Sequence, residues 1–253
     1  MRAALVLVVI ARVAHAEPTD HSREIDTAIF VGGGITYLGV EFGLKHYIVR
    51  PCVWCEPPGF DLAARNALVW DHPNTAGIVS TVSGYAAAPL LATGLLVGAT
   101  WDQGNRRRYF DDVIPVLEAA VATGLLHHVT KFTIPRRRPF VKFSPADRPA
   151  DDDDNASLFS GHTALAFAVT VAGGIVADKR GYAVEPYIWA GGFALAVATG
   201  YLRIAADKHW TSDVLIGAVV GTAIGITTPF LHRDSFDRPS GVAMPLLGYA
   251  TAL

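Results

Sequence analysis

The segment VLIGAVVGTAIGITTPFL, residues 214–231, carries no charged side chain over 18 residues. A helix needs about 20 predominantly apolar residues to cross the hydrocarbon core of a bilayer, so this segment predicts a membrane-spanning helix. Gly217, Gly221 and Gly225 recur at every fourth position within it. They would form a ridge of small residues on one helix face, which lets neighbouring helices in a membrane approach closely.

Several other segments share this apolar character, namely 76–100, 113–130, 163–177 and 186–202. A sixth segment, 27–49, is a weaker candidate because Glu41, Lys45 and His46 crowd its second half. No internal repeat is visible, and no run of residues predicts a sheet. We therefore expect an all-α fold, a transmembrane bundle of five to six helices. The alternative is a soluble helical bundle outside the cytoplasm that buries these segments in its own core.

The composition of the chain limits its class. Hydrophobic residues make up 51% of the 253 residues and charged residues 17%, and the mean hydropathy is +0.32. These values exclude a disordered chain. The 21 basic and 23 acidic residues give a net charge of -2. Because so balanced a charge does not favour binding to a phosphate backbone, we expect no nucleic acid partner.

The first residues have the layout of a secretory signal peptide. Arg2 precedes an apolar run, and small residues end the segment at Ala16, so the pattern predicts a signal peptide at 1–16 that is cleaved after Ala16. The rest of the chain is expected to have three parts. Residues 17–75 form an N-terminal helix and a cysteine-containing extracytoplasmic loop. Residues 76–231 form a helical domain with its motif core at 113–231, and residues 232–253 form a tail.

Basic residues in the loops predict the orientation of the bundle. Loops 101–112 and 178–185 would be cytoplasmic by the positive-inside rule, which places loops 131–160 and 203–213 outside. A cleaved signal peptide would start the mature chain outside, and a spanning segment 27–49 would then invert this arrangement. Two solutions remain open: the first 16 residues stay cytoplasmic, or 27–49 does not fully cross the membrane.

The first outward loop predicts an anion-binding turn. Lys131 is followed by Arg138-Pro139, and proline disfavours a continuing helix. An extended turn of this kind can bring an ammonium and a guanidinium to one phosphate group. The planar guanidinium can donate to two phosphate oxygens at once. For Arg136 and Arg137 we favour a simpler interpretation, a basic flank that faces water beside the membrane.

The second motif is Ser160-Gly161-His162, directly before an apolar segment. Serine caps helices well, and the start of a helix presents free amides and a partial positive charge to an oxyanion. His162 would lie beside such an anion and could protonate a leaving alkoxide.

The third motif is the most specific and joins Arg203, His209 and Asp213. A separation of four residues would place His209 and Asp213 on one helical face. A carboxylate that accepts from one imidazole nitrogen leaves the other nitrogen free to act as a nucleophile. Arg203 could then hold the anion under attack.

Together these residues resemble the type 2 phosphatidic acid phosphatase family, which shares its core with the vanadium haloperoxidases and the bacterial class A acid phosphatases. The family pattern is K-x6-R-P, then P-S-G-H, then S-R-x5-H-x3-D, and the resemblance covers roughly residues 113–231. Phe159 stands where the family has proline and Leu202 where it has serine. These two departures bear on substrate preference and rate more than on reaction class.

The resemblance implies a phosphatidic acid phosphatase/haloperoxidase-type helical core and a role for each matching residue. His209 would form a phosphohistidine, Asp213 would orient it and His162 would protonate the leaving group. The phosphoryl oxygens would be bound by Lys131, Arg138, Ser160, Gly161 and Arg203. The family needs no metal and no cofactor for this reaction.

Other polar residues give weaker signals. Cys52 and Cys55 lack a second ligand pair, so we expect a local disulfide or two plain thiols rather than zinc. The run at 151–154 is more typical of a solvated loop than of a cation site. His127 and His128 lie on an apolar segment, where packed or interfacial histidines are more common than ligands.

The expected activity is hydrolysis of a phosphate ester or diphosphate by a membrane enzyme. A pocket between spanning segments would lie near the lipid headgroups, so we expect a lipid phosphate or diphosphate as substrate and the membrane as partner. The expected location is the cytoplasmic (inner) membrane, multi-pass, with the active site facing the periplasm. The alternatives are a vanadate-dependent haloperoxidase with the same pocket, and a non-catalytic protein that binds or transports lipids.

Overall fold

The computed structural model describes residues 23–48, 50–102, 104, 108–144 and 153–232. Over this part of the chain the regular structure is helical, apart from isolated bridges that pair Arg136 with Trp54 and with Ala156. The all-α fold class is therefore confirmed. The expected signal peptide at 1–16 lies outside the described residues, and so does almost all of the expected tail.

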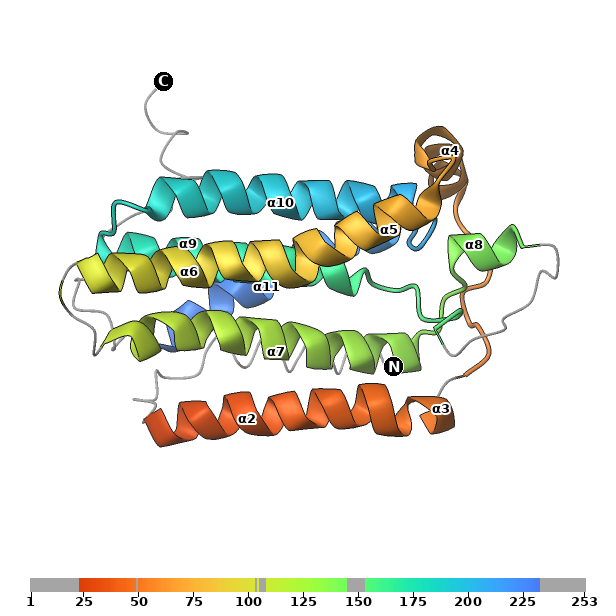
Figure 1. Cartoon of the computed structure of the whole chain (residues 1–253). Helices are drawn as coiled ribbons and strands as arrows, with labels where there is room; N and C mark the ends of the chain where they lie inside the picture. The colour runs from red at the N-terminus through yellow and green to blue at the C-terminus, as the bar shows by residue number, and fades with distance from the viewer. Residues whose placement is uncertain (1–22, 49, 103, 105–107, 145–152, 233–253) are drawn as a thin grey trace, which may run out of the picture.

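The long helices lie side by side as a bundle (Figure 1). Two of them contain a π-helical turn, at Val40–Leu44 and at Ser83–Ala87. The helices are α2 (Arg23–Gly39), α3 (Lys45–Ile48), α4 (Gly59–Leu68), α5 (Pro73–Val82), α6 (Ala88–Asp102), α7 (Tyr109–Thr133), α8 (Pro139–Lys142), α9 (Gly161–Arg180), α10 (Glu185–Ala205) and α11 (Thr211–Leu231).

Six helical segments of the described chain are long and apolar enough to cross a membrane by length and composition. This is the upper number expected from the sequence. The weak candidate at 27–49 is among them, because it forms a helix of 25 residues with its π-helical turn included. The six are Glu24–Ile48, Pro73–Asp102, Tyr109–Thr133, Gly161–Arg180, Glu185–Ala205 and Thr211–Leu231.

Helix α9 is the most buried of these segments and packs against α7, α10 and α11. Glycines on α11 make the close contacts between α9 and α11 possible. A Cβ atom on Gly221 would lie 2.1 Å from the carbonyl oxygen of Ala164, and one on Gly217 would lie 2.7 Å from that of Ser160. No residue larger than glycine fits at these two positions. The backbones of α9 and α11 therefore pack in direct contact where α9 begins.

Helix α2 packs along α7 and runs the length of the bundle (Figure 1). Its contact with α7 is close, because a Cβ atom on Gly124 would lie 2.8 Å from the ring of Tyr37. α2 begins at the end of the bundle where α6 meets α7, and α3 ends at the opposite end, which also carries α4 and α8 (Figure 1).

Candidate active site

The three motifs meet at the end of the bundle that carries α4 and α8 (Figure 1). The first lies at the end of α7 and the start of α8, the second at the start of α9, and the third between α10 and α11. Chain segments that are far apart in the sequence therefore contribute to one buried polar region.

His209 lies at the centre of this region with 2% of its surface exposed. Its Nδ1 atom is 2.8 Å from the carbonyl oxygen of Ser157. A carbonyl only accepts hydrogen bonds, so Nδ1 carries the proton and Nε2 carries the lone pair. Arg138 Nη1 donates to this Nε2 at 3.3 Å and to the carbonyl of Lys208 at 3.0 Å.

The surroundings of His209 favour its neutral form. Burial, followed by the positive charges of Arg138 and Arg203, holds the pKa of His209 well below its usual value. The imidazole is therefore uncharged at neutral pH, as a nucleophile must be.

Asp213 acts on His209 differently from the expectation. Its Oδ2 atom is 3.9 Å from His209 Nδ1, too far for a hydrogen bond. The helical spacing argument fails because α11 begins at Thr211, after His209. Instead, Ser157 Oγ donates to Asp213 Oδ2 at 2.6 Å, while the carbonyl of the same serine accepts from His209. The carboxylate thus holds the residue that orients the imidazole.

Arg136 is a residue whose importance the sequence analysis missed. The expectation of a basic flank facing water is wrong, because 1% of Arg136 is exposed. Its guanidinium donates to Asp61 Oδ2 at 2.7 Å and also to Asp213, and it stacks on Trp54 at 3.7 Å from the ring centroid. No sequence pattern connects Arg136 with Asp61, which lies 75 residues away on α4. The neighbouring Arg137 is half-buried.

His162 lies in the first turn of α9 and faces α5 and its π-helical turn. Its Nε2 atom is 3.3 Å from Thr81 Oγ1, and its ring meets the edge of Tyr85 at 4.2 Å. Arg138 and Arg203 are close enough to interact electrostatically with it, as they do with His209. The two histidines expected from the sequence therefore share the same pair of arginines.

The start of α9 is built somewhat differently from the expectation. The Ser160 hydroxyl pairs with Thr163 at 2.8 Å and caps the helix, and its amide donates to the Asp213 carbonyl at 3.0 Å. Both Ser160 groups expected to bind phosphate therefore have partners within the protein. The amides of Gly161 and His162 lie in the first turn, where a helix lacks internal acceptors, and they can serve an anion instead.

Arg203 and Lys131 supply further positive charge, in different ways. Arg203 Nη1 donates to Ser80 Oγ at 3.3 Å, and its buried Nε has no hydrogen-bond partner among the described residues. Lys131 is already paired, because its Nζ donates to Glu41 Oε2 at 2.7 Å. Glu41 comes from the π-helical turn that follows α2 and also contacts His128 at 2.8 Å.

The acidic run at 151–154 is not simply solvated over its two described residues. Asp153 forms an ion pair with Lys45 at 2.6 Å, and its carbonyl accepts from Arg138 Nε at 2.7 Å. Asp154 is buried, with 5% of its surface exposed. The end of this run therefore helps to position the arginine beside His209.

An apolar cavity of about 300 Å³ adjoins the polar region. It lies between α2, α7 and α9 and reaches from Leu38, Val121 and Leu165 to Gly161 and His127. His127 Nε2 is buried and has no hydrogen-bond partner in the described chain. This cavity can hold an apolar chain next to the amides at the start of α9.

The remaining sequence candidates take structural positions. Cys52 and Cys55 form a disulfide, one of the two states expected for them. Phe159 is buried beside the ring of His127 at 5.4 Å between centroids. Leu202 packs in an apolar cluster with Ala76.

Comparisons with known proteins agree with this architecture. The model of the PAP2 superfamily matches residues 112–237. The crystal structure of a transmembrane PAP2 type phosphatidylglycerolphosphate phosphatase from Bacillus subtilis superimposes with a TM-score of 0.53 at 17% identity. That superposition covers 85% of this chain and 98% of the other. Aquifex aeolicus LpxE superimposes with a TM-score of 0.46 at 23% identity, over 68% of this chain and 93% of the other.

One relative is the lipid A 1-phosphatase of Porphyromonas gingivalis, which is 37% identical over 82 residues. The match includes 32% of this chain but only 18% of the length of that relative. With the family match, the shared fold and the six candidate spans taken together, the chain is a multi-span membrane protein that belongs to the PAP2 superfamily.

Proposed function

We propose that this protein is a membrane phosphatase that hydrolyses a phosphate ester or diphosphate of a lipid through a phosphohistidine on His209. The observation that carries the proposal is the state of this histidine. Its Nδ1 atom donates to a backbone carbonyl, and its Nε2 lone pair accepts from Arg138 in a buried polar region. A neutral imidazole next to paired arginines is suited to attack a bound phosphoryl group.

In the first step, His209 Nε2 attacks phosphorus and a P–N bond forms while the P–O bond to the leaving group breaks. His162, which takes up a proton when the anionic phosphate binds beside Arg138 and Arg203, donates that proton to the departing oxygen. Arg138, Arg203 and the first amides of α9 stabilise the charge that spreads over the phosphoryl oxygens. The proton stays on His209 Nδ1, which keeps donating to the Ser157 carbonyl, and this hydrogen bond stabilises the positive charge gained by the ring.

In the second step, a water molecule attacks the phosphohistidine. His162, now deprotonated, accepts a proton from this water, the P–N bond breaks, and phosphate leaves with both histidines restored. Asp213 maintains the geometry through Ser157 and through the amide of Trp210, which donates to it at 3.0 Å. In both steps, side chains and backbone amides of the protein supply the positive charge that stabilises the phosphoryl oxygens.

A lipid substrate is supported by the cavity beside the site. Its apolar walls adjoin the amides at the start of α9, so an acyl or prenyl chain could lie there with its phosphate beside His209. One relative is named as a lipid A 1-phosphatase, and its name states a lipid substrate. We propose that the site faces the periplasm from the cytoplasmic membrane, because loops 101–112 and 178–185 belong to the other end and carry basic residues that the positive-inside rule places in the cytoplasm.

The test is release of phosphate from phosphatidate, a polyprenyl diphosphate and lipid A by the purified protein in detergent. His209→Ala should lower kcat at least about 10³-fold, as loss of a nucleophile does. His72→Ala is the matched control, because His72 is an exposed histidine just before α5, outside the site. Equal turnover by wild type and His209→Ala would end the proposal.

Trapping the intermediate tests the chemistry more directly. Rapid quenching with a substrate labelled on its phosphate should leave an acid-labile, base-stable label on wild type and none on His209→Ala. His162→Ala should still bind phosphate while its turnover falls. Binding without turnover in wild type would instead identify a lipid-binding protein.

A further inference from the structure

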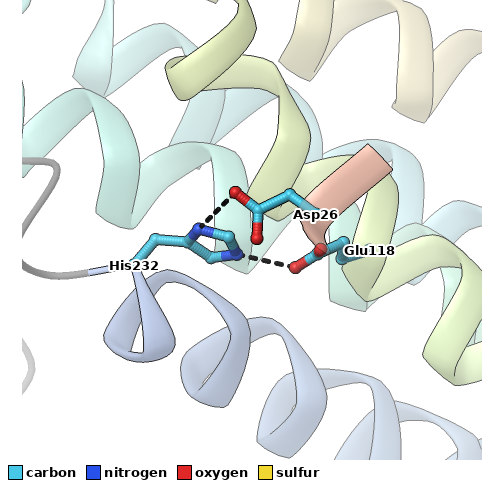
Figure 2. Close-up of side chains that lie close together, drawn as sticks. All are labelled: Asp26, Glu118 and His232. Carbon is cyan, nitrogen blue, oxygen red and sulfur yellow. Dashed lines mark hydrogen bonds and ion pairs between the residues drawn. The ribbon is translucent and has the colours of Figure 1, made fainter. Parts of the chain in front are cut away.

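A second group of ionisable side chains lies at the end of the bundle opposite the candidate active site. Asp26 near the start of α2, Glu118 in α7 and His232 directly after α11 face one another (Figure 2). All three are buried, with exposed fractions of 4%, 7% and 4%. We propose that this Asp26–Glu118–His232 cluster binds a divalent transition metal ion of the Zn²⁺ or Mn²⁺ class, which fastens α2 and α11 to α7.

The distances in the cluster suit one shared ion. His232 Nε2 lies 2.6 Å from Glu118 Oε2, and His232 Nδ1 lies 3.7 Å from Asp26 Oδ2. One possible ligand atom from each residue lies within 4.8 Å of the other two. Metal–ligand bonds of about 2.0–2.2 Å place neighbouring ligands roughly 3–3.5 Å apart. Small rotations of the three side chains would therefore bring one donor atom from each around a single ion.

The second oxygen of Glu118 gives an independent reason to expect a ligand. Oε1 is buried and has no hydrogen-bond partner in the described part of the chain, although the carboxylate points into the cluster. A buried carboxylate oxygen without a donor is costly. The contact with His232 satisfies Oε2 alone, whereas a cation bound by both oxygens would satisfy the whole carboxylate.

The donor set indicates the class of ion. One imidazole and two carboxylates suit Zn²⁺ or Mn²⁺, whereas Ca²⁺ and Mg²⁺ prefer oxygen ligands alone. Ionisable residues inside spanning helices are rare, and Glu118 lies within one. The cluster is at the far end from His209, so its expected role is structural and its metal takes no part in phosphate release.

The test uses the full chain, purified in detergent without a polyhistidine tag, stripped with a chelator and then equilibrated with Zn²⁺ or Mn²⁺. Mass spectrometry after removal of free metal should find about one equivalent per chain, and less than about a tenth of that in Glu118→Gln and His232→Ala. Glu185→Gln is the control, since Glu185 is a carboxylate at the same end of the bundle outside the cluster. It should keep the full equivalent.

Thermal unfolding adds a second readout. Free metal at about a hundred times its dissociation constant should raise the midpoint of wild type by roughly 5–10 °C and leave Glu118→Gln unchanged. If Glu118→Gln does not fold, Glu118→Asp should fold and bind metal at least about tenfold more weakly. Wild type that retains no metal, or Glu118→Gln that retains a full equivalent, would overturn the metal site. Phosphate release is measured separately, so a failed metal site and a failed phosphatase are distinguishable.

Discussion

Replacing Arg136 with methionine should weaken the end of the bundle that holds the candidate active site. The Arg136 guanidinium bridges the carboxylates of Asp61 and Asp213, and both of these residues have exposed fractions of 0%. Methionine retains much of the volume but leaves both carboxylates without their cation. Removing one partner of a buried ion pair costs about 3–5 kcal/mol, so the free energy of unfolding should fall by at least that amount.

The effect can be measured as the midpoint of thermal unfolding in detergent. For a chain of this size, a change of 1 kcal/mol shifts the midpoint by about 2–4 °C, so Arg136→Met should unfold roughly 6–20 °C lower than wild type. Arg137→Met is the matched control, because the neighbouring arginine is half-buried and its guanidinium lies 3.9 Å from Cys52 Sγ. Its loss should change stability by less than about 1 kcal/mol. Equal midpoints for the two variants would refute the reasoning.

Three further predictions concern the site and the core. Arg138→Gln removes one of the charges that lower the pKa of His209, so this pKa should rise, and a histidine-ring NMR titration that shows no rise would contradict the assignment. Glu41→Gln removes the negative charge beside the motif lysine, so inorganic phosphate should inhibit at about tenfold lower concentration, and weaker inhibition would count against this interpretation. Gly221→Ala should destabilise the bundle by about 1–3 kcal/mol in thermal unfolding, whereas Gly98→Ala, beside open space, should not.

The spanning helices were predictable because charge-free runs of bilayer length leave a chain few other structures. The motifs identified His162, Arg203 and His209, which share one buried region, but neither their contacts nor their roles follow from spacing alone. Spacing placed His209 and Asp213 on one helix face. The structure differs because the chain becomes helical only after Trp210. The turn between α10 and α11 therefore decides which group bonds the imidazole.

The partners of the basic residues could not be predicted. Arg136 pairs with a carboxylate on α4, and Lys131 pairs with Glu41 after α2, so each contact joins residues that lie far apart in the sequence. The sequence around Arg136 is typical of an ordinary charged loop. The sequence around Glu41 is an apolar segment interrupted by charged residues. Glu41 and Asp61 reach the basic residues of the motifs only because the chain around α2 and α4 packs against those motifs.

The position of Glu41, Trp54 and Asp61 has a consequence for how this protein can be divided. All three precede residue 112, where the family match begins, yet they contact Lys131 or Arg136. A fragment cut at the family boundary would leave Lys131 without Glu41, and Arg136 without Asp61 and Trp54. Truncated or chimeric versions should therefore keep the chain from α2 onward, since the boundary of the family match is not a boundary of folding here.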